Sequence, residues 1–142
     1  MTTLVIASDH AGFELKAVIK LGLEKNGHKA IDLGPNEASS VDYPDMADKL
    51  AGALLDGLAD KGVLICGTGI GIGIAANRHR HVRAALCHDV TTARLAREHN
   101  DANVLCLGAR VIGAEVALDS VEAFLGTPFE GGRHQRRVDK LG

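Results

Sequence analysis

Five short apolar runs, separated by segments of helical periodicity, constrain the fold of this chain more than any other feature. The runs lie at residues 4–8, 28–33, 63–66, 83–87 and 103–107. Apolar residues at helical spacing predict helices over 13–26, about 44–59, 70–77, 89–98 and 113–125. Strands that alternate with helices form a parallel sheet with right-handed crossovers and helices on both faces. The sequence therefore predicts a single α/β domain over residues 1–142, with a five-stranded parallel sheet, a Rossmann-like three-layer fold and the strand order 2-1-3-4-5.

This topology predicts where a ligand binds. In open parallel sheets, ligands bind beyond the carboxyl ends of the strands, at the point where the strand order reverses. With the predicted order, that point lies between the first and third strands. The first run ends in Asp9 and His10, and the third ends in Cys66. We therefore expect Asp9 and His10 to face Cys66 across one crevice.

The segment after the third run is unusually rich in glycine. It reads Cys66-Gly-Thr-Gly-Ile-Gly71 and leads directly into a predicted helix. Glycines let main-chain N–H groups approach a bound anion, and the start of a helix adds its own free N–H groups. A thiol beside such groups is biased toward the thiolate, which would make Cys66 a base or a nucleophile. The alternative is a packed cysteine that merely ends a core strand.

Several familiar phosphate-binding loops are excluded by their spacing. The chain has no G-x-x-x-x-G-K-[ST] segment, so it carries no nucleoside-triphosphate P-loop. Cysteine-dependent phosphatases need an arginine six places after the nucleophile, where this chain has Ile72. The run Gly71-Ile-Gly73-Ile-Ala-Ala76, with Asp89 further on, matches the dinucleotide pattern weakly, because its first glycine lies five residues past the strand. A nucleotide- or flavin-binding module stays open as an alternative of a different class.

Composition argues for a small-molecule partner. A net charge of −2, one tyrosine and no tryptophan do not suit a nucleic-acid surface. No apolar run approaches the roughly 18 residues of a membrane span. Three cysteines without C-x-x-C spacing argue against disulfides and zinc, and the start of the chain has no basic signal-peptide region, so we expect a cytoplasmic protein. His79 and His81 are spaced as a metal pair, but a solvated basic turn is the favoured interpretation, since we expect no carboxylate or third ligand nearby.

The end of the chain is basic. Arg133 and Arg137 are four residues apart, so on a helix over 133–141 they share a face and could bind one phosphate, while Arg136 points elsewhere. The alternative is a basic helix end that complements its own dipole. Few apolar residues hold this segment to its own domain, so we expect it to pack on a second subunit. Three other candidates also carry structural alternatives: His99 as a dipole-stabilising helix end, Tyr43 as a core ring and Arg110 as an ordinary exposed arginine.

Taken together, these segments resemble the B-type ribose-5-phosphate isomerase family, which also contains the galactose-6-phosphate isomerase subunits. The likeness runs nearly end to end, with small departures at Gly73 and Arg78. It rests on Ser8-Asp9-His10-Ala11-Gly12, Cys66-Gly-Thr-Gly-Ile-Gly71 with Ala75-Ala-Asn77, His99-Asn-Asp-Ala-Asn-Val104, Leu107-Gly-Ala-Arg110 and Glu130-Gly-Gly-Arg-His-Gln-Arg-Arg137.

The resemblance implies an isomerase that interconverts ribose 5-phosphate and ribulose 5-phosphate through an enediolate, with no cofactor and no metal. It implies Cys66 as the base, and positions 70, 72 and 74, which are isoleucine, offer no carboxylate rival. It implies catalytic roles for Cys66, His99, Thr68 and Asp9, with His99 and a nearby Asp9 opening the sugar ring. Further contacts to the sugar phosphate are implied for His10, Tyr43, Gly67, Gly69, Ile70, Gly71, Asn100, Arg110, Arg133 and Arg137.

The same resemblance implies a homodimer, or a tetramer, whose site is completed across the subunit interface. The identity of the sugar stays open, because some relatives act on allose 6-phosphate or on free aldoses.

Overall fold

The computed structural model describes residues 2–142, whose five strands form one parallel sheet in the order β2-β1-β3-β5-β4. The strands are β1 (Thr3–Ser8), β2 (Lys29–Asp32), β3 (Gly62–Cys66), β4 (Ala84–Leu86) and β5 (Val104–Gly108). The helices are α1 (Phe13–Lys25), α2 (Tyr43–Leu55), α3 (Ile70–Ala76), α4 (Val90–Asn100), α5 (Ala114–Gly126) and α6 (Arg133–Asp139). The predicted α/β class and the element order are confirmed. The helix α2 ends before the predicted residue 59, because Gly57 turns the chain with φ +80°.

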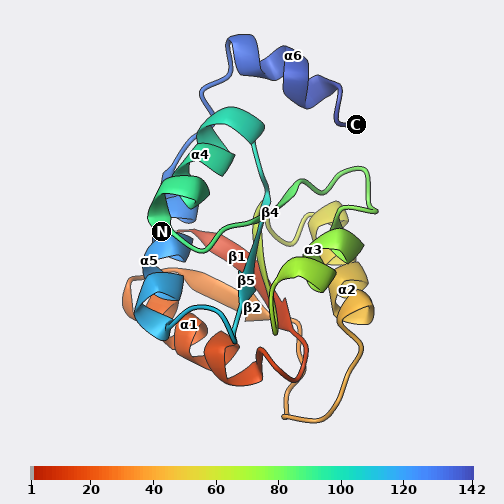
Figure 1. Cartoon of the computed structure of the whole chain (residues 1–142), viewed down its shortest axis with the longest axis vertical. Coiled ribbons are helices and arrows are strands. Elements are labelled where there is room, and N and C mark those ends of the chain that lie inside the picture. The colour runs from red at the N-terminus through yellow and green to blue at the C-terminus, as the bar shows by residue number, and fades with distance from the viewer. Residues whose placement is uncertain (1) are drawn as a thin grey trace.

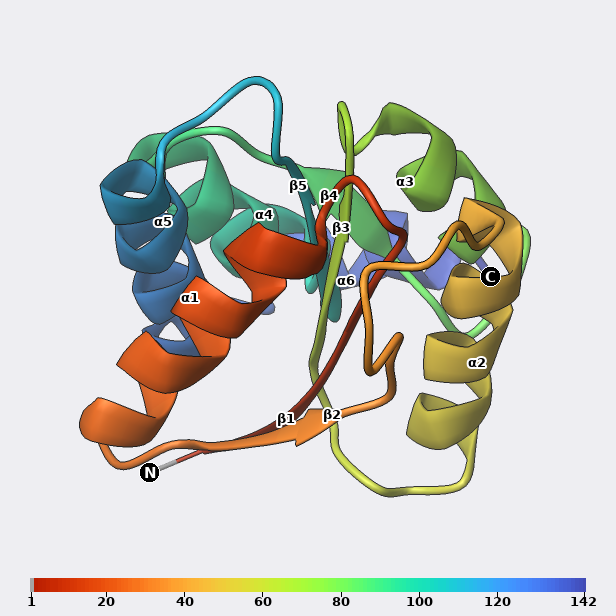
Figure 2. The ribbon, with the colours of Figure 1, turned by 90° about the horizontal axis from the view of Figure 1, so that it is seen from below.

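The helices cover both faces of the sheet. Figure 2 shows α1, α4 and α5 on one side of the strands and α2 and α3 on the other. Alternate residues of each strand enter the two layers: Leu4 and Ile6 pack in the α1, α4 and α5 layer, whereas Val5 and Ala7 pack against α2 and α3. This alternation is the period of two that a strand buried on both faces requires. The three-layer prediction is therefore confirmed.

The predicted order of the last two strands is wrong, because β5 lies beside β3 and β4 takes the edge. The observed order agrees with how deeply each of the two strands is buried. All five residues of β5 are buried, whereas the three residues of β4 are partly or largely exposed, as suits an edge strand. In the register of β3 and β5, Cys66 pairs with Gly108. The loop after β5 therefore lies against the glycine-rich loop after β3.

The two ends of the sheet carry different groups. The strand order reverses between β1 and β3, as predicted, so the loops after these strands meet at the carboxyl edge. The helix α6 stands apart from the sheet, beyond the amino ends of the strands (Figure 1). Within residues 2–142, every helix is too short or too polar to cross a bilayer.

Candidate active site

The sulfur of Cys66 lies at the end of β3, under the glycine-rich loop. The residue is buried, with only 4% of its surface exposed. Its Sγ accepts a hydrogen bond from the Gly69 N–H at 3.1 Å. Gly69 has φ +79°, and a Cβ atom there would lie 2.5 Å from Leu86 and 2.9 Å from the Leu107 main chain. Only glycine fits this turn, and the turn aims a main-chain donor at the sulfur.

The other two cysteines are ordinary core residues. Burial raises the pKa of Cys87 and, more strongly, that of the fully buried Cys106. Both therefore stay neutral thiols at neutral pH. All three cysteines are free, as predicted.

Two side chains pack directly on the glycine loop. A Cβ atom on Gly71 would lie 2.7 Å from the ring of Tyr43, and one on Gly67 would lie 3.1 Å from Nη1 of Arg110. The Arg110 N–H also donates to the Gly67 carbonyl at 2.9 Å. The absence of side chains at these two glycines thus makes room for a phenol and a guanidinium. Tyr43 is 41% exposed, so the core-ring alternative for it is wrong.

The loop after β1 reaches the same edge. The Asp9 N–H donates to the Ile65 carbonyl at 3.1 Å, and the buried Asp9 carboxylate accepts the Gly12 N–H at 3.1 Å. His10 is exposed, and its Nδ1 accepts the Val41 N–H at 3.4 Å. Asp9 and His10 therefore lie at the same edge as Cys66, as the topology predicts.

The rest of the loop is open to solvent. Thr68 and Ile70 are exposed, and the Ile70 N–H donates to the Thr68 hydroxyl at 3.2 Å. Two of the loop amides, those of Gly69 and Ile70, are therefore engaged within the loop itself.

The weak match to the dinucleotide-binding pattern does not correspond to a dinucleotide-binding turn, because Gly71 and Gly73 lie inside α3 and not at the turn that ends the strand.

Four of the predicted site residues lie at the opposite end of the sheet, near the amino ends of its strands. His99 and Asn100 end α4, a few residues before β5 begins, and Arg133 and Arg137 lie on α6. The five-residue strand between the two edges is roughly 16 Å long. Within a single chain, Asp9 and His99 therefore lie at opposite ends of the strands, so the expected proximity of the two could arise only between chains.

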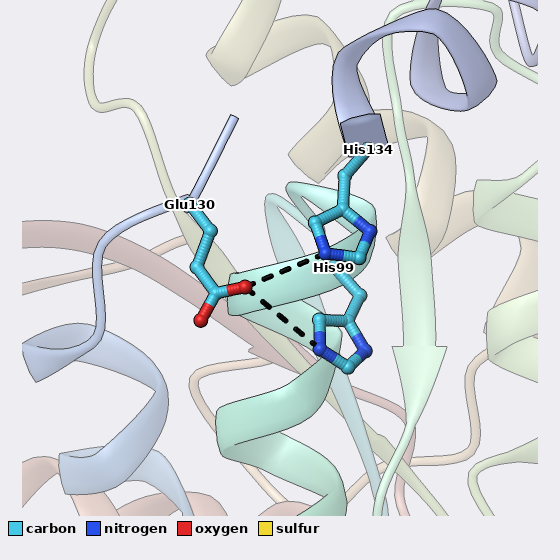
Figure 3. Close-up of side chains that lie close together, drawn as sticks. All are labelled: His99, Glu130 and His134. Atoms are coloured by element: carbon cyan, nitrogen blue, oxygen red, sulfur yellow. Dashed lines mark ion pairs between the residues drawn. The ribbon is translucent and has the colours of Figure 1, made fainter. Parts of the chain in front are cut away.

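His99 has two neighbours that the sequence reasoning missed. Its ring stacks on that of His134, with the centroids 4.4 Å apart and the planes 17° from parallel. Glu130 Oε1 lies 3.4 Å from His134 Nε2 and 4.0 Å from His99 Nε2 (Figure 3). Glu130 and His134 are four residues apart, and this spacing was the only signal in the sequence that they could lie together. The spacing does not predict that the end of α4 brings His99 beside them.

His79 and His81 contact different protein groups. His79 Nε2 lies 2.8 Å from an oxygen of Asp48, and His81 Nε2 lies 2.8 Å from the Ala51 carbonyl. The two rings meet edge to face. The expectation of no carboxylate nearby is wrong, because Asp48 supplies one beside His79.

Replacing Gly69 with alanine should both destabilise the protein and misplace the sulfur. A left-handed alanine costs about 1 kcal/mol or more, and the overlap with Leu107 and Leu86 adds about 1–3 kcal/mol. Chemical unfolding should show this loss. Gly52→Ala is the matched control, since Gly52 lies within α2 with open space at its Cβ, and there we expect a gain of about 0.5–1 kcal/mol. Equal stability of the two variants would contradict the role given to the Gly69 turn.

Residues 4–141 match the family model described as Ribose/Galactose Isomerase. The chain is 45% identical to ribose-5-phosphate isomerase B of Escherichia coli K12, over 99% of this chain and 95% of that protein. Among solved structures it is similar to a ribose 5-phosphate isomerase of Thermotoga maritima, with 53% identity, a TM-score of 0.96, and coverage of 99% of this chain and 97% of that one. It is also similar to the type B ribose 5-phosphate isomerase of Trypanosoma brucei, with 43% identity, a TM-score of 0.94, and coverage of 99% and 97%.

Proposed function

The chain belongs to the Ribose/Galactose Isomerase family, and from that premise we propose that it interconverts ribose 5-phosphate and ribulose 5-phosphate with Cys66 as the base. The observation that carries this proposal is the sulfur of Cys66, held by the Gly69 N–H at 3.1 Å under a loop on which Tyr43 and Arg110 pack. The relatives from E. coli and T. maritima supply the choice of sugar.

The chemistry assigns each group a step. The Cys66 thiolate takes the proton from C2 of the open-chain aldose, and the electron pair of that bond moves to form the enediolate. Main-chain N–H groups of the glycine loop stabilise its negative oxygens. The hydroxyl proton on O2 then moves to O1, and the sulfur returns its proton to C1 as the C2 carbonyl forms, which gives the ketose. Ring opening needs an acid and a base on the sugar oxygens, for which we propose His99 and Asp9.

We propose that the site is completed by a second copy of the chain in a homodimer, or in a tetramer of such dimers. His99, Asn100, Arg133 and Arg137 lie too far from Cys66 of their own chain to act with it. An apolar groove between α3 and β4 supports the proposal, because it borders the glycine loop at Gly69 and Ile70. Its rim is largely exposed, with Ile70 and Ile74 each 53% and Leu86 42% exposed. A partner that covers this groove and the open edge of β4 would also approach the loop.

Measuring the preferred sugar tests the function itself. We expect the purified protein to turn over ribose 5-phosphate faster than allose 6-phosphate and far faster than either free aldose. In deuterated water, solvent deuterium should appear on the sugar carbon, because an enediolate exchanges its proton with the base. Faster turnover of allose 6-phosphate would mean that allose 6-phosphate, and not ribose 5-phosphate, is the substrate. Turnover without deuterium on the sugar carbon would contradict an enediolate whose proton exchanges with solvent.

Replacing Arg137 with glutamine should raise KM for ribose 5-phosphate about tenfold or more and change kcat much less, because the phosphate is bound alike in the ground and transition states. Steady-state kinetics separates the two constants. Arg136→Gln is the matched control, since adjacent residues on a helix do not face each other, and Arg136 lies about 100° around α6 from Arg137. An equal rise in KM for both variants would indicate a general effect of charge and not a specific phosphate contact.

We further propose that residues 1–142 form one sugar-phosphate isomerase domain that works in the cytoplasm. Three free, buried cysteines suit a reducing compartment.

A further inference from the structure

We propose that His99, Glu130 and His134 form a binding site for zinc or a similar divalent transition-metal ion, and that an ion bound there inhibits the enzyme. The binding site stands on its own geometry. The inhibition rests on the proposed function, in which His99 transfers protons.

The geometry of the three side chains is already close to that of a metal site. Their ligand atoms all lie within 4.8 Å of one another, and both histidine Nε2 atoms point toward the same oxygen of Glu130 (Figure 3). Zinc binds nitrogen and oxygen at about 2.0–2.2 Å, so two ligands of a tetrahedral ion lie roughly 3.4 Å apart. His134 Nε2 and Glu130 Oε1 are at that separation. His99 Nε2 must come about 0.6 Å closer to Glu130 Oε1, and the two histidine nitrogens, which lie within 4.8 Å of each other, must also converge to about 3.4 Å.

The side chains of His99 and Glu130 have room to make this movement. His99 and Glu130 have 41% and 53% of their side-chain surface exposed, so little packing opposes a small rotation of either. That rotation also takes the His99 ring out of its near-parallel stack on His134, which lets both lone pairs converge on one point. The same exposure gives an ion access from solvent.

The main chain fixes the positions from which the three side chains start. The Glu130 N–H donates to the Glu98 carbonyl at 3.1 Å, which ties the segment before α6 to the last turn of α4. Arg97 strengthens this junction by donating to the Thr127 carbonyl at 3.1 Å. Gly131 and Gly132 then turn the chain with φ +67° and +55°, so that His134 returns over Glu130. The cluster is therefore a built junction of three segments.

The donor set suits zinc. Two histidines and one glutamate, with a fourth position open to water, form a known type of zinc site. Imidazole ligands also favour nickel, copper and zinc over magnesium or calcium. Across residues 2–142, this is the only place where three His, Cys, Asp or Glu side chains meet in this way. The pair of His79 and Asp48 has only two such donors and serves as an internal comparison.

An ion on Nε2 of His99 would occupy the lone pair that ring opening requires. Zinc also binds thiolates, so inhibition by zinc could arise at Cys66 instead. A test must therefore locate the ion and not only record the loss of activity.

Cobalt is the probe that locates it, because its visible absorption bands report tetrahedral nitrogen and oxygen ligands and a near-ultraviolet charge-transfer band reports a thiolate ligand. We expect one cobalt ion per chain, visible bands and no thiolate band.

Loss of an outer-shell partner of a metal lowers affinity about 10- to 100-fold, so Glu130→Gln and His134→Gln should each weaken zinc binding at least that much. His79→Gln, a matched control, and Cys66→Ser should bind as the unchanged protein does. Unchanged binding in Glu130→Gln and His134→Gln, or lost binding in Cys66→Ser, would overturn the site.

Activity measured in parallel separates the two parts of the proposal. We expect zinc to inhibit the metal-free enzyme, a chelator to reverse the inhibition, and His134→Gln to need at least tenfold more zinc. Equal zinc sensitivity of that variant would overturn the inhibitory role even where the cobalt spectra support the site. Failure of the metal-free protein to turn over any sugar phosphate would overturn the proposed function, while the spectra still decide the metal site. Circular dichroism of each variant checks that α6 and the fold are retained.

Discussion

Replacing Cys66 with alanine should lower kcat for ribose 5-phosphate by about a thousandfold or more, because a positioned base contributes about 10²–10⁴ to the rate. Binding of the sugar phosphate should change little, since the phosphate contacts lie on other residues. Solvent deuterium should also stop entering recovered substrate, because no other group takes the C2 proton. Kinetics, a binding titration and proton NMR measure these three quantities.

Cys87→Ala controls for the loss of a buried sulfur. Cys87 is as buried as Cys66, and burial raises its pKa, so it cannot act as a thiolate at neutral pH. We expect this variant to lose stability but to keep kcat. If Cys66→Ala were to keep kcat within a few fold of that of the unchanged enzyme, Cys66 would be a packed residue at the end of its strand and not the base. Its 4% exposure is by itself consistent with either role.

Much of the fold follows from local pattern, whereas the neighbours of each strand do not. Five apolar runs and the helices between them predict a parallel sheet, but periodicity does not say which strand lies next to which. The available signal was the contrast between Val104-Leu-Cys-Leu-Gly108, which is apolar throughout, and the three-residue β4. A fully apolar strand belongs inside the sheet, and a short one at its edge.

The wrong strand order hid one contact of the candidate site. Arg110 follows β5, and only the pairing of β5 with β3 brings its guanidinium over Gly67. Tyr43 presented a similar difficulty, because its contact with Gly71 depends on the packing of α2 against α3. Sequence reasoning could name these residues as candidates, but it could not decide between a site and an ordinary surface position.

The position of His99 could have been predicted. In a parallel α/β sheet, each crossover helix ends where the next strand begins, so its last residues lie at the amino edge. His99 and Asn100 end the helix before β5, whereas Cys66 ends a strand. Topology alone therefore separates His99 from Cys66, even though resemblance to a family gives both a catalytic role. The proposed dimer would resolve this conflict, because His99 of one chain could then act with Cys66 of the other.

Producing Cys66→Ala and His99→Asn together in one cell should restore activity that neither variant has alone. In a mixed dimer, one site combines both substitutions, and the other combines an intact Cys66 with an intact His99 from the partner. Random pairing makes half of the dimers mixed, so we expect about a quarter of the activity of the unchanged enzyme. The measurement is turnover of ribose 5-phosphate by the mixed preparation, in a host that lacks other ribose-5-phosphate isomerases.

A second pair shows whether the recovery comes from the shared geometry. Cys66 and Asp9 lie at the same edge of one chain, since the Asp9 N–H donates to Ile65 beside Cys66. Mixing Cys66→Ala with Asp9→Asn leaves every site with one substitution, so no recovery is expected. Recovery in this pair would indicate that Asp9 acts across the interface. No recovery in the first pair would remove His99 from catalysis, because the buried strand β5 keeps it from reaching Cys66 of its own chain while the fold persists.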